Sequence, residues 1–201
     1  LIEFDIKFIE RPKTNKEKIW KGYNIEFKVT HEKDWYVDDL EKNRREAIKI
    51  VDQSTKFSVD ISSFEYIASA KKVDLDGTVL LVYTPEMIVI EKLRALCQSI
   101  PEYKDIIPSA KTKGRARDFY DIWNICEQNP IDFSLEGNVI LLHEIFNAKK
   151  VPIKFLDLLP EYKDLQKENW NSVEDTLSST NKGFDFYFDY TMALVEKIKN
   201  L

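Results

Sequence analysis

Apolar and polar residues alternate along the N-terminal segments of the chain, and this period of two predicts β-strands. Residues 1–9 read LIEFDIKFI, with one predicted apolar face and one charged face. The apolar face comprises Ile2, Phe4, Ile6 and Phe8, and the charged face comprises Glu3, Asp5 and Lys7. Residues 22–30 and 57–62 are predicted as further strands, with a helix over residues 37–52. Asp76-Gly77 predicts a hairpin, because this pair favours a turn in which both central residues have positive φ.

From Thr84 onward the apolar residues recur at helical spacing. Thr84 can cap a helix with its hydroxyl, and Pro85 suits the first helical position, where no backbone donor is needed. A second helix is predicted to begin near Arg115, with a buried stripe at spacing i, i+3, i+4, i+7. That stripe is Phe119, Ile122, Trp123 and Cys126. Further helical segments are predicted at residues 135–148, 154–159, 163–177 and 183–200, the last with aromatic residues that pack in the core.

These patterns predict an α+β fold. A mixed-sheet domain is expected over residues 1–84, followed by a helical bundle over residues 85–201. The chain begins directly in a strand, so we expect that its natural N-terminus lies upstream of Leu1.

Composition and charge limit the classes of protein. The 201 residues are 43% hydrophobic and 12% aromatic, which is typical of a globular chain with a core. The net charge of −5 excludes a uniformly basic nucleic-acid-binding protein, although the basic loop KTKGRAR at residues 111–117 could contact phosphates. Cys97 and Cys126 lie on predicted apolar helix faces and favour a reducing cytoplasm. No apolar run is long enough for a membrane span, so a soluble cytoplasmic protein is expected.

Lys92, Asp118 and Asp121 are the first candidates for chemistry. Glu91, Arg94 and Gln98 share one polar stripe of the first helix, whereas Lys92 is flanked by apolar neighbours and is predicted to lie off the solvent face. The ordinary alternative is a lysine at the edge of the core that reaches solvent. For the aspartates, the alternative is surface pairing of Arg115 with Asp118 and of Arg117 with Asp121, worth ~0.3–0.5 kcal/mol each.

The two helices carry a family resemblance. The segment TPEMIVIEKLRALC followed by GRARDFYDIWNIC resembles the AbiEii/AbiGii family of nucleotidyltransferase-like toxins, within the DNA polymerase β-like superfamily. Weaker similarity lies in KGYNIEFKV and in NWNSVEDTL near the C-terminus. The resemblance implies active-site roles for Lys92 and for one of Asp118 and Asp121. Arg115 and Arg117 are candidate phosphate-binding residues because they belong to the basic loop at residues 111–117.

The superfamily pattern also implies a metal site. It has a Gly-Ser turn, two acidic residues separated by one apolar residue, and a third acidic residue on a later strand. Glu3 and Asp5 match the pair, and Asp60, on a strand predicted to be central, matches the third position. These carboxylates would hold Mg²⁺, which prefers oxygen ligands, and Asp60 would also serve as the general base. The ordinary alternative for Glu3 and Asp5 is a solvated strand face.

By this resemblance the expected reaction is Mg²⁺-dependent transfer of a nucleotide from an NTP to an acceptor, with tRNA as one acceptor, in a toxin–antitoxin or phage-defence system. A cognate antitoxin is the expected protein partner. Two departures favour a different outcome, a catalytically inactive interaction module on the same fold. Glu3 stands where Asp is usual, and no Gly-Ser turn precedes it in the sequence. A third alternative is a helical domain whose charged residues are all surface pairs.

Overall fold

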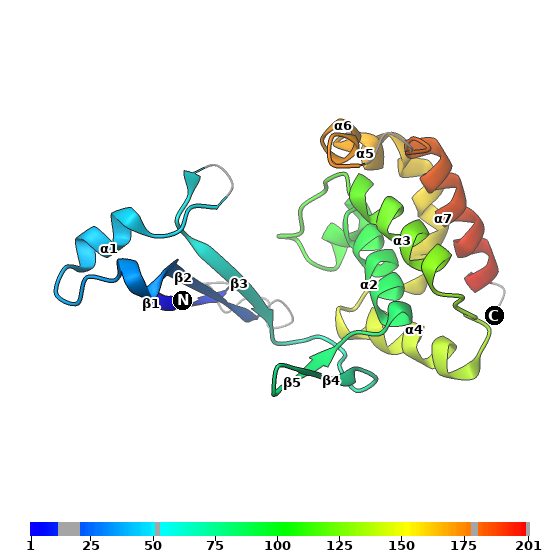
Figure 1. The fold of residues 1–201 in the computed structure, drawn as a ribbon. Helices are drawn as coiled ribbons and strands as arrows, with labels where there is room; N and C mark the ends of the chain where they lie inside the picture. The colour runs from blue at the N-terminus through cyan, green and yellow to red at the C-terminus, as the bar shows by residue number, and fades with distance from the viewer. Residues whose placement is uncertain (12–20, 51–52, 178–180, 200–201) are drawn as a thin grey trace. The chain divides into compact units, whose positions relative to one another are not determined.

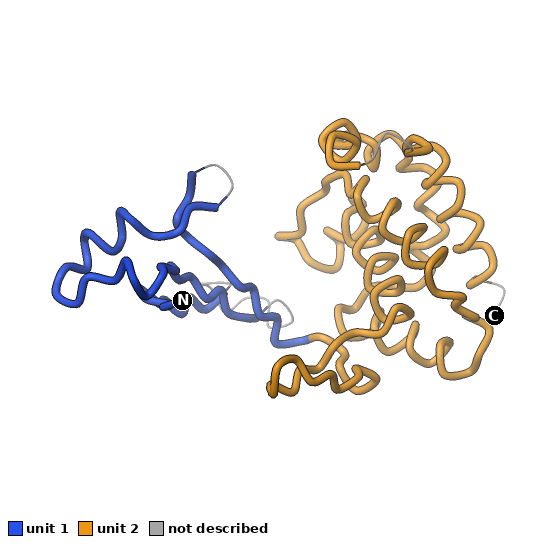
Figure 2. The backbone as a smooth tube through the Cα atoms, in the orientation of Figure 1, with its two compact units in different colours: residues 1–64 blue, residues 65–201 orange. Residues whose placement is uncertain are grey.

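The computed structural model describes residues 1–11, 21–50, 53–177 and 181–199. The chain divides into two compact units, Leu1–Phe64 and Glu65–Leu201 (Figure 2). The elements of both units are drawn in Figure 1, and together they make an α+β protein, as predicted. Within the described residues, no helix is long and apolar enough to cross a membrane.

The first unit is built on a three-stranded antiparallel sheet. Its strands are β1 (Ile2–Arg11), β2 (Gly22–Thr30) and β3 (Phe57–Ser62), in the order β1-β2-β3. The sheet is accompanied by the short helices η2 (Glu32–Asp34) and α1 (Leu40–Glu46). The helix predicted over residues 37–52 is therefore shorter than expected, and residues 51–52 lie outside the described part of the chain. The expectation that residues 57–62 form a central strand is wrong, because β2 is central and β3 lies at an edge.

The predicted face of β1 is correct only in part, because the strand contains a bulge. Between the pairs Phe4–Lys28 and Lys7–Glu26, β1 has two residues where β2 has one. Asp5 is the first of these two residues and adopts a φ of 52°. A bulge of this kind interrupts the alternation of faces. Phe4 is buried accordingly, whereas Ile6 and Phe8 are 53% and 72% exposed.

The second unit begins with the predicted hairpin. Strands β4 (Lys71–Leu75) and β5 (Thr78–Val82) pair antiparallel across Asp76 and Gly77. Those two residues have φ values of 51° and 82°, as the turn prediction requires. Contacts group this hairpin with the helices that follow it. The functional division predicted at residues 84 and 85 stays a prediction.

The rest of the second unit is helical. Its elements are α2 (Pro85–Gln98), η4 (Pro101–Asp105), α3 (Ala116–Gln128), α4 (Glu136–Ala148), η5 (Ile153–Tyr162), α5 (Lys163–Lys167), α6 (Trp170–Glu174) and α7 (Phe184–Lys199). Helix α2 packs against α3 and α4, and α3 packs against α7. The main buried side chains are Met87, Ile90, Leu93, Leu96, Phe119, Ile122, Ile145, Phe146, Leu156, Phe184 and Tyr187.

Aromatic residues of α7 fill the space against α3, as predicted for core packing. The Phe119 ring stacks on Phe188, with centroids 5.3 Å apart, and meets Phe184 edge to face at 5.4 Å. Such pairs contribute ~0.5–1.5 kcal/mol beyond the area they bury. Cys97 is buried and Cys126 is half-buried, both as free thiols. Burial raises the pKa of both thiols, so both remain protonated near neutral pH.

Candidate active site

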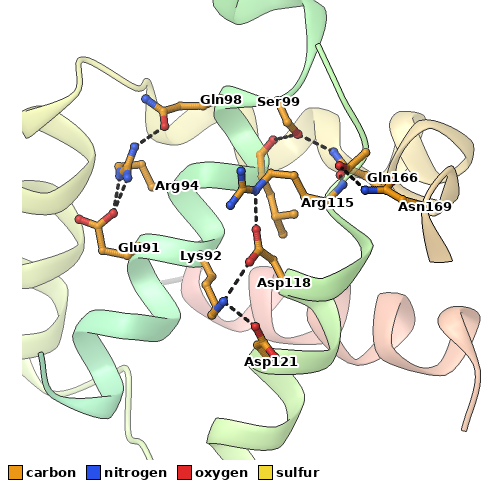
Figure 3. Close-up of polar contacts among 12 residues, drawn as sticks. Glu91, Lys92, Arg94, Gln98, Ser99, Arg115, Asp118, Asp121, Gln166 and Asn169 are labelled. Carbon is orange, nitrogen blue, oxygen red and sulfur yellow. Dashed lines mark hydrogen bonds and ion pairs between the residues drawn. The ribbon is translucent and has the colours of Figure 1, made fainter. Parts of the chain in front are cut away.

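The start of α2 fixes the position of Lys92. The Thr84 hydroxyl accepts a hydrogen bond from the Met87 backbone N–H at 3.4 Å, and Pro85 occupies the first turn, so the predicted cap is confirmed. From this start, Lys92 lies on the side of α2 that faces α3 (Figure 3).

The Lys92 ammonium lies between two carboxylates of α3. Its Nζ donates to Asp118 Oδ1 at 2.9 Å and to Asp121 Oδ2 at 2.7 Å. Asp118 is buried and the Lys92 side chain is 21% exposed. The three residues come from segments 26 and 29 positions apart in sequence, and the packing of α2 on α3 brings them together. Lys92 therefore lies off the solvent face, as predicted.

Opposing effects act on the pKa of Lys92. Burial alone would lower it, but the charge of Asp118 and the hydrogen bonds to Asp121 and Asp118 outweigh burial, so the pKa is raised. Lys92 is consequently a permanent cation at neutral pH. In a partly buried setting this charge interacts with an approaching anion more strongly than a fully solvated lysine would.

Two arginines complete the cluster. Arg115 Nε donates to Asp118 Oδ2, and Arg117 Nε donates to Asp121 Oδ1 at 3.0 Å. Both pairings were anticipated as surface bridges. Here, however, each carboxylate uses its second oxygen to bind Lys92. Three cations surround two carboxylates, which leaves the cluster with an excess of positive charge suited to binding phosphate.

Side chains that the sequence did not single out join the ends of α2 and α3. Gln166 of α5 is fully buried and hydrogen-bonds to both the Arg115 backbone and Ser99. Asn169 donates to the Gly114 carbonyl oxygen at 3.1 Å. Nothing in the spacing of the sequence marks these contacts, because they join residues 51 to 67 positions apart.

The polar stripe predicted for α2 is not on the solvent face. Arg94 is only 7% exposed, and its guanidinium contacts Glu91 and Gln98. Gln98 donates in turn to the Tyr103 hydroxyl at 3.1 Å. Burial raises the pKa of Glu91, and the charge of Arg94 opposes this rise only in part. The polar side chains of this stripe pair with one another in the interior. The periodicity of the sequence cannot distinguish such a buried polar stripe from one exposed to solvent.

The carboxylates of the first unit are placed differently. Glu3 is exposed, whereas Asp5 accepts a bidentate pair of hydrogen bonds from Arg44 at 3.0 and 3.1 Å. This pairing lowers the pKa of Asp5 against the opposing effect of burial. Asp60 is exposed, and its Oδ1 accepts from Asn24 Nδ2 at 2.8 Å.

The positions of Glu3, Asp5 and Asp60 bear on the predicted Mg²⁺ site. Among the residues that the structure describes, no group of three or more His, Cys, Asp or Glu side chains could hold a metal ion. Glu3, Asp5 and Asp60 thus do not fit an assembled Mg²⁺ site as they are placed. Their assignment as ligands stays a prediction.

The geometry therefore defines an α+β protein with a lysine–aspartate cluster between two packed helices. Residues 3–190 match the family model described as "Nucleotidyl transferase AbiEii toxin, Type IV TA system". The match covers most of the chain, so the chain belongs to this family of nucleotidyltransferase toxins, as the two helical motifs indicated. No curated protein and no solved structure matches the chain.

Proposed function

We propose that the protein transfers a nucleotide from an NTP to an acceptor and acts as the toxin of a toxin–antitoxin pair in the cytoplasm. The observation that carries this proposal is the cluster of Lys92, Asp118 and Asp121, which lies inside the segment matched by the family. Arg115 and Arg117, which pair with the two aspartates, add the charge that a triphosphate requires.

In the proposed reaction, an acceptor hydroxyl oxygen bonds to the α-phosphorus of the NTP. The bond from that phosphorus to its bridging oxygen breaks, pyrophosphate leaves, and the hydroxyl proton passes to a base. Lys92 would exchange one carboxylate partner for a phosphate oxygen and stabilise the charge that develops there. Asp60 is the proposed base for the hydroxyl proton. Asp118 or Asp121 would orient Lys92.

The proposed cofactor is Mg²⁺, because phosphoryl transfer develops charge that a divalent cation neutralises. Its proposed ligands are Glu3, Asp5 and Asp60, and metal binding would displace Arg44 from Asp5. The proposed acceptor is an RNA such as tRNA, which the basic loop at residues 111–117 would contact through phosphates. The proposed partner is the antitoxin of the same system, and phage defence is its proposed setting.

A second candidate is an inactive interaction module on the same fold. The specific observation in its favour is that both oxygens of Asp5 accept hydrogen bonds from Arg44 and that Asp60 Oδ1 accepts one from Asn24. In this case the Lys92 cluster would join α2 to α3 without binding a nucleotide.

Isothermal titration of each NTP with Mg²⁺ separates the two candidates. Wild-type protein extended to its natural start would be compared with Lys92→Ala. The matched control is Lys163→Ala, because Lys163 also lies between two aspartates, Asp185 at 2.9 Å and Asp189 at 3.6 Å. The proposal expects micromolar binding that Lys92→Ala weakens at least about tenfold and Lys163→Ala leaves intact.

Two results would overturn the enzyme proposal in favour of the module. One is the absence of binding by any NTP to the folded wild type. The other is equal binding by wild type and Lys92→Ala. Circular dichroism on every variant verifies that the proteins compared are folded.

A further inference from the structure

Gln166 is a fully buried amide that takes no part in the proposed chemistry. Its Oε1 accepts a hydrogen bond from the Arg115 backbone N–H at 3.0 Å, and its Nε2 donates to Ser99 Oγ at 2.8 Å. Ser99 follows the last residue of α2, and Arg115 precedes the first residue of α3. One side chain thus joins the end of one helix to the start of the next (Figure 3).

The hydrogen bond from the Arg115 N–H to Gln166 lies at the start of α3. Arg115 is the N-cap of α3, and no side chain caps this end of the helix from within. The first N–H groups of a helix lack partners inside it. Gln166 contacts the backbone at this end, and Asp118 follows one turn later, with its N–H bonded to the Arg115 carbonyl oxygen at 2.9 Å. Arg115 and Asp118 are therefore linked directly through the backbone of the first turn of α3.

Asn169 also binds the backbone before α3, but as a donor and at the preceding residue, Gly114. Its Nδ2 donates to the Gly114 carbonyl oxygen, and there is no space between the two segments. A Cβ atom at Gly114 would lie 2.5 Å from Asn169 Oδ1 and 2.5 Å from the Leu165 carbonyl oxygen. The loop before α3 is consequently packed directly on residues 165–169.

Ser99 completes the connection on the side of α2. Its hydroxyl donates to the Leu96 carbonyl oxygen at 2.7 Å, and its own carbonyl oxygen accepts from the Lys113 N–H at 3.3 Å. Lys92 lies two helical turns before Ser99. The amide of Gln166 is thereby hydrogen-bonded to both of the helices that supply the cluster.

From this geometry we propose that Gln166, supported by Asn169, is the positioning residue that sets Asp118 against Lys92. Its role in catalysis rests on the proposed function, but its role in geometry does not. The two residues act through the backbone of α3 and touch neither Lys92 nor the aspartate carboxylates in this arrangement. Loss of the Gln166 amide would let the start of α3 move, and the Lys92–Asp118 contact would weaken while the core remains intact.

The test observes Lys92 directly and requires no nucleotide. The ¹³Cε resonance of Lys92 is followed by NMR as pH rises, in wild type, Gln166→Leu and Asn169→Ala. The expected result is a Lys92 pKa lower than in wild type in both variants, with the larger change in Gln166→Leu. The matched control is Thr191→Val, which removes another fully buried hydrogen bond of the same unit, from Thr191 Oγ1 to the Tyr187 carbonyl oxygen at 2.9 Å. Thr191→Val should leave the Lys92 titration unchanged.

An unchanged Lys92 titration in folded Gln166→Leu would overturn the proposal. So would an equal change in Thr191→Val, because the effect would then reflect general loosening of the unit. Asn169 is exposed, so the Asn169→Ala variant is expected to fold even if Gln166→Leu does not. In that event an unchanged titration in Asn169→Ala overturns the proposal by itself.

Nucleotide binding then separates this inference from the proposed function. If wild type binds an NTP, Gln166→Leu is expected to bind it about tenfold more weakly, the change that 1.4 kcal/mol produces. If wild type binds none, the proposed function fails, yet the Lys92 titrations still decide whether Gln166 positions the cluster.

Discussion

The acidic pair of the helical unit and that of the sheet unit differ in whether their two carboxylates share a partner. Asp118 and Asp121 lie three residues apart on a helix and share one ammonium group. Glu3 and Asp5 lie two residues apart on a strand, but Asp5 binds Arg44 while Glu3 is exposed. A helix fixes its spacing by hydrogen bonds within one segment, whereas the faces of a strand depend on its register with a neighbour. The helical pair therefore keeps the geometry that its spacing predicts, and the strand pair loses it at the bulge.

The largest expected effect comes from removing the buried carboxylate of the helical pair. Asp118→Ala leaves Lys92 and Arg115 without one partner each in a partly buried setting, which should cost about 2 kcal/mol of unfolding free energy. Urea unfolding measures the loss. The control is Asp185→Ala, because Asp185 is exposed and pairs with Lys163 at the surface. Equal losses in the two variants would show that burial does not distinguish the cluster from a surface pair.

An intermediate effect is expected when Lys92 is deprotonated. Because its pKa is raised in the folded protein, Lys92 contributes stability that is fully present below its ordinary value of 10.5. That contribution is lost as pH rises through the higher folded value. Above about pH 10.5, the unfolding free energy of wild type should fall more steeply with rising pH than that of Lys92→Met. Parallel curves would contradict the assigned pKa direction.

The smallest effect is expected in the first unit. The pKa of Asp5 is lowered by Arg44, so its contribution is present above the ordinary value of 3.8 and is lost as pH falls through the lower folded value. Asp5→Asn should make the unfolding free energy fall less steeply at acid pH. The difference from wild type should be less than about 1 kcal/mol, since the Asp5–Arg44 pair lies near the surface. Glu3→Gln, which alters an exposed carboxylate of the same strand, is the control variant measured beside Asp5→Asn. A larger change in Glu3→Gln than in Asp5→Asn would reverse the comparison between the two carboxylates.

The sequence predicted most of the local structure. Thr84 and Pro85 located the start of α2, Asp76-Gly77 located the hairpin, and helical spacing placed Lys92 off the solvent face. These features depend on short segments with strong local preferences. The bulge at Asp5 and the edge position of β3 depend on how strands pair, and a single sequence does not encode that pairing in any short motif.

The contacts of Gln166 and the buried pairing of Arg94 were missed for a related reason. Both residues look like ordinary polar positions on a helix, and polarity usually indicates exposure. Gln166 and Arg94 are buried by tertiary packing, and both form hydrogen bonds with other side-chain or backbone groups there. Polar residues in the core are thus the part of the site that requires a structure.

The hairpin of β4 and β5 has a practical consequence for work with this protein. Its apolar side chains are exposed on both faces, among them Val73, Leu75, Val79, Leu80, Leu81 and Val82. A short ribbon with apolar faces and unpaired edges is a common starting point for self-association. Concentrated samples are therefore expected to be limited by aggregation before they are limited by thermal unfolding, and a charged substitution such as Leu80→Lys should extend the usable concentration range.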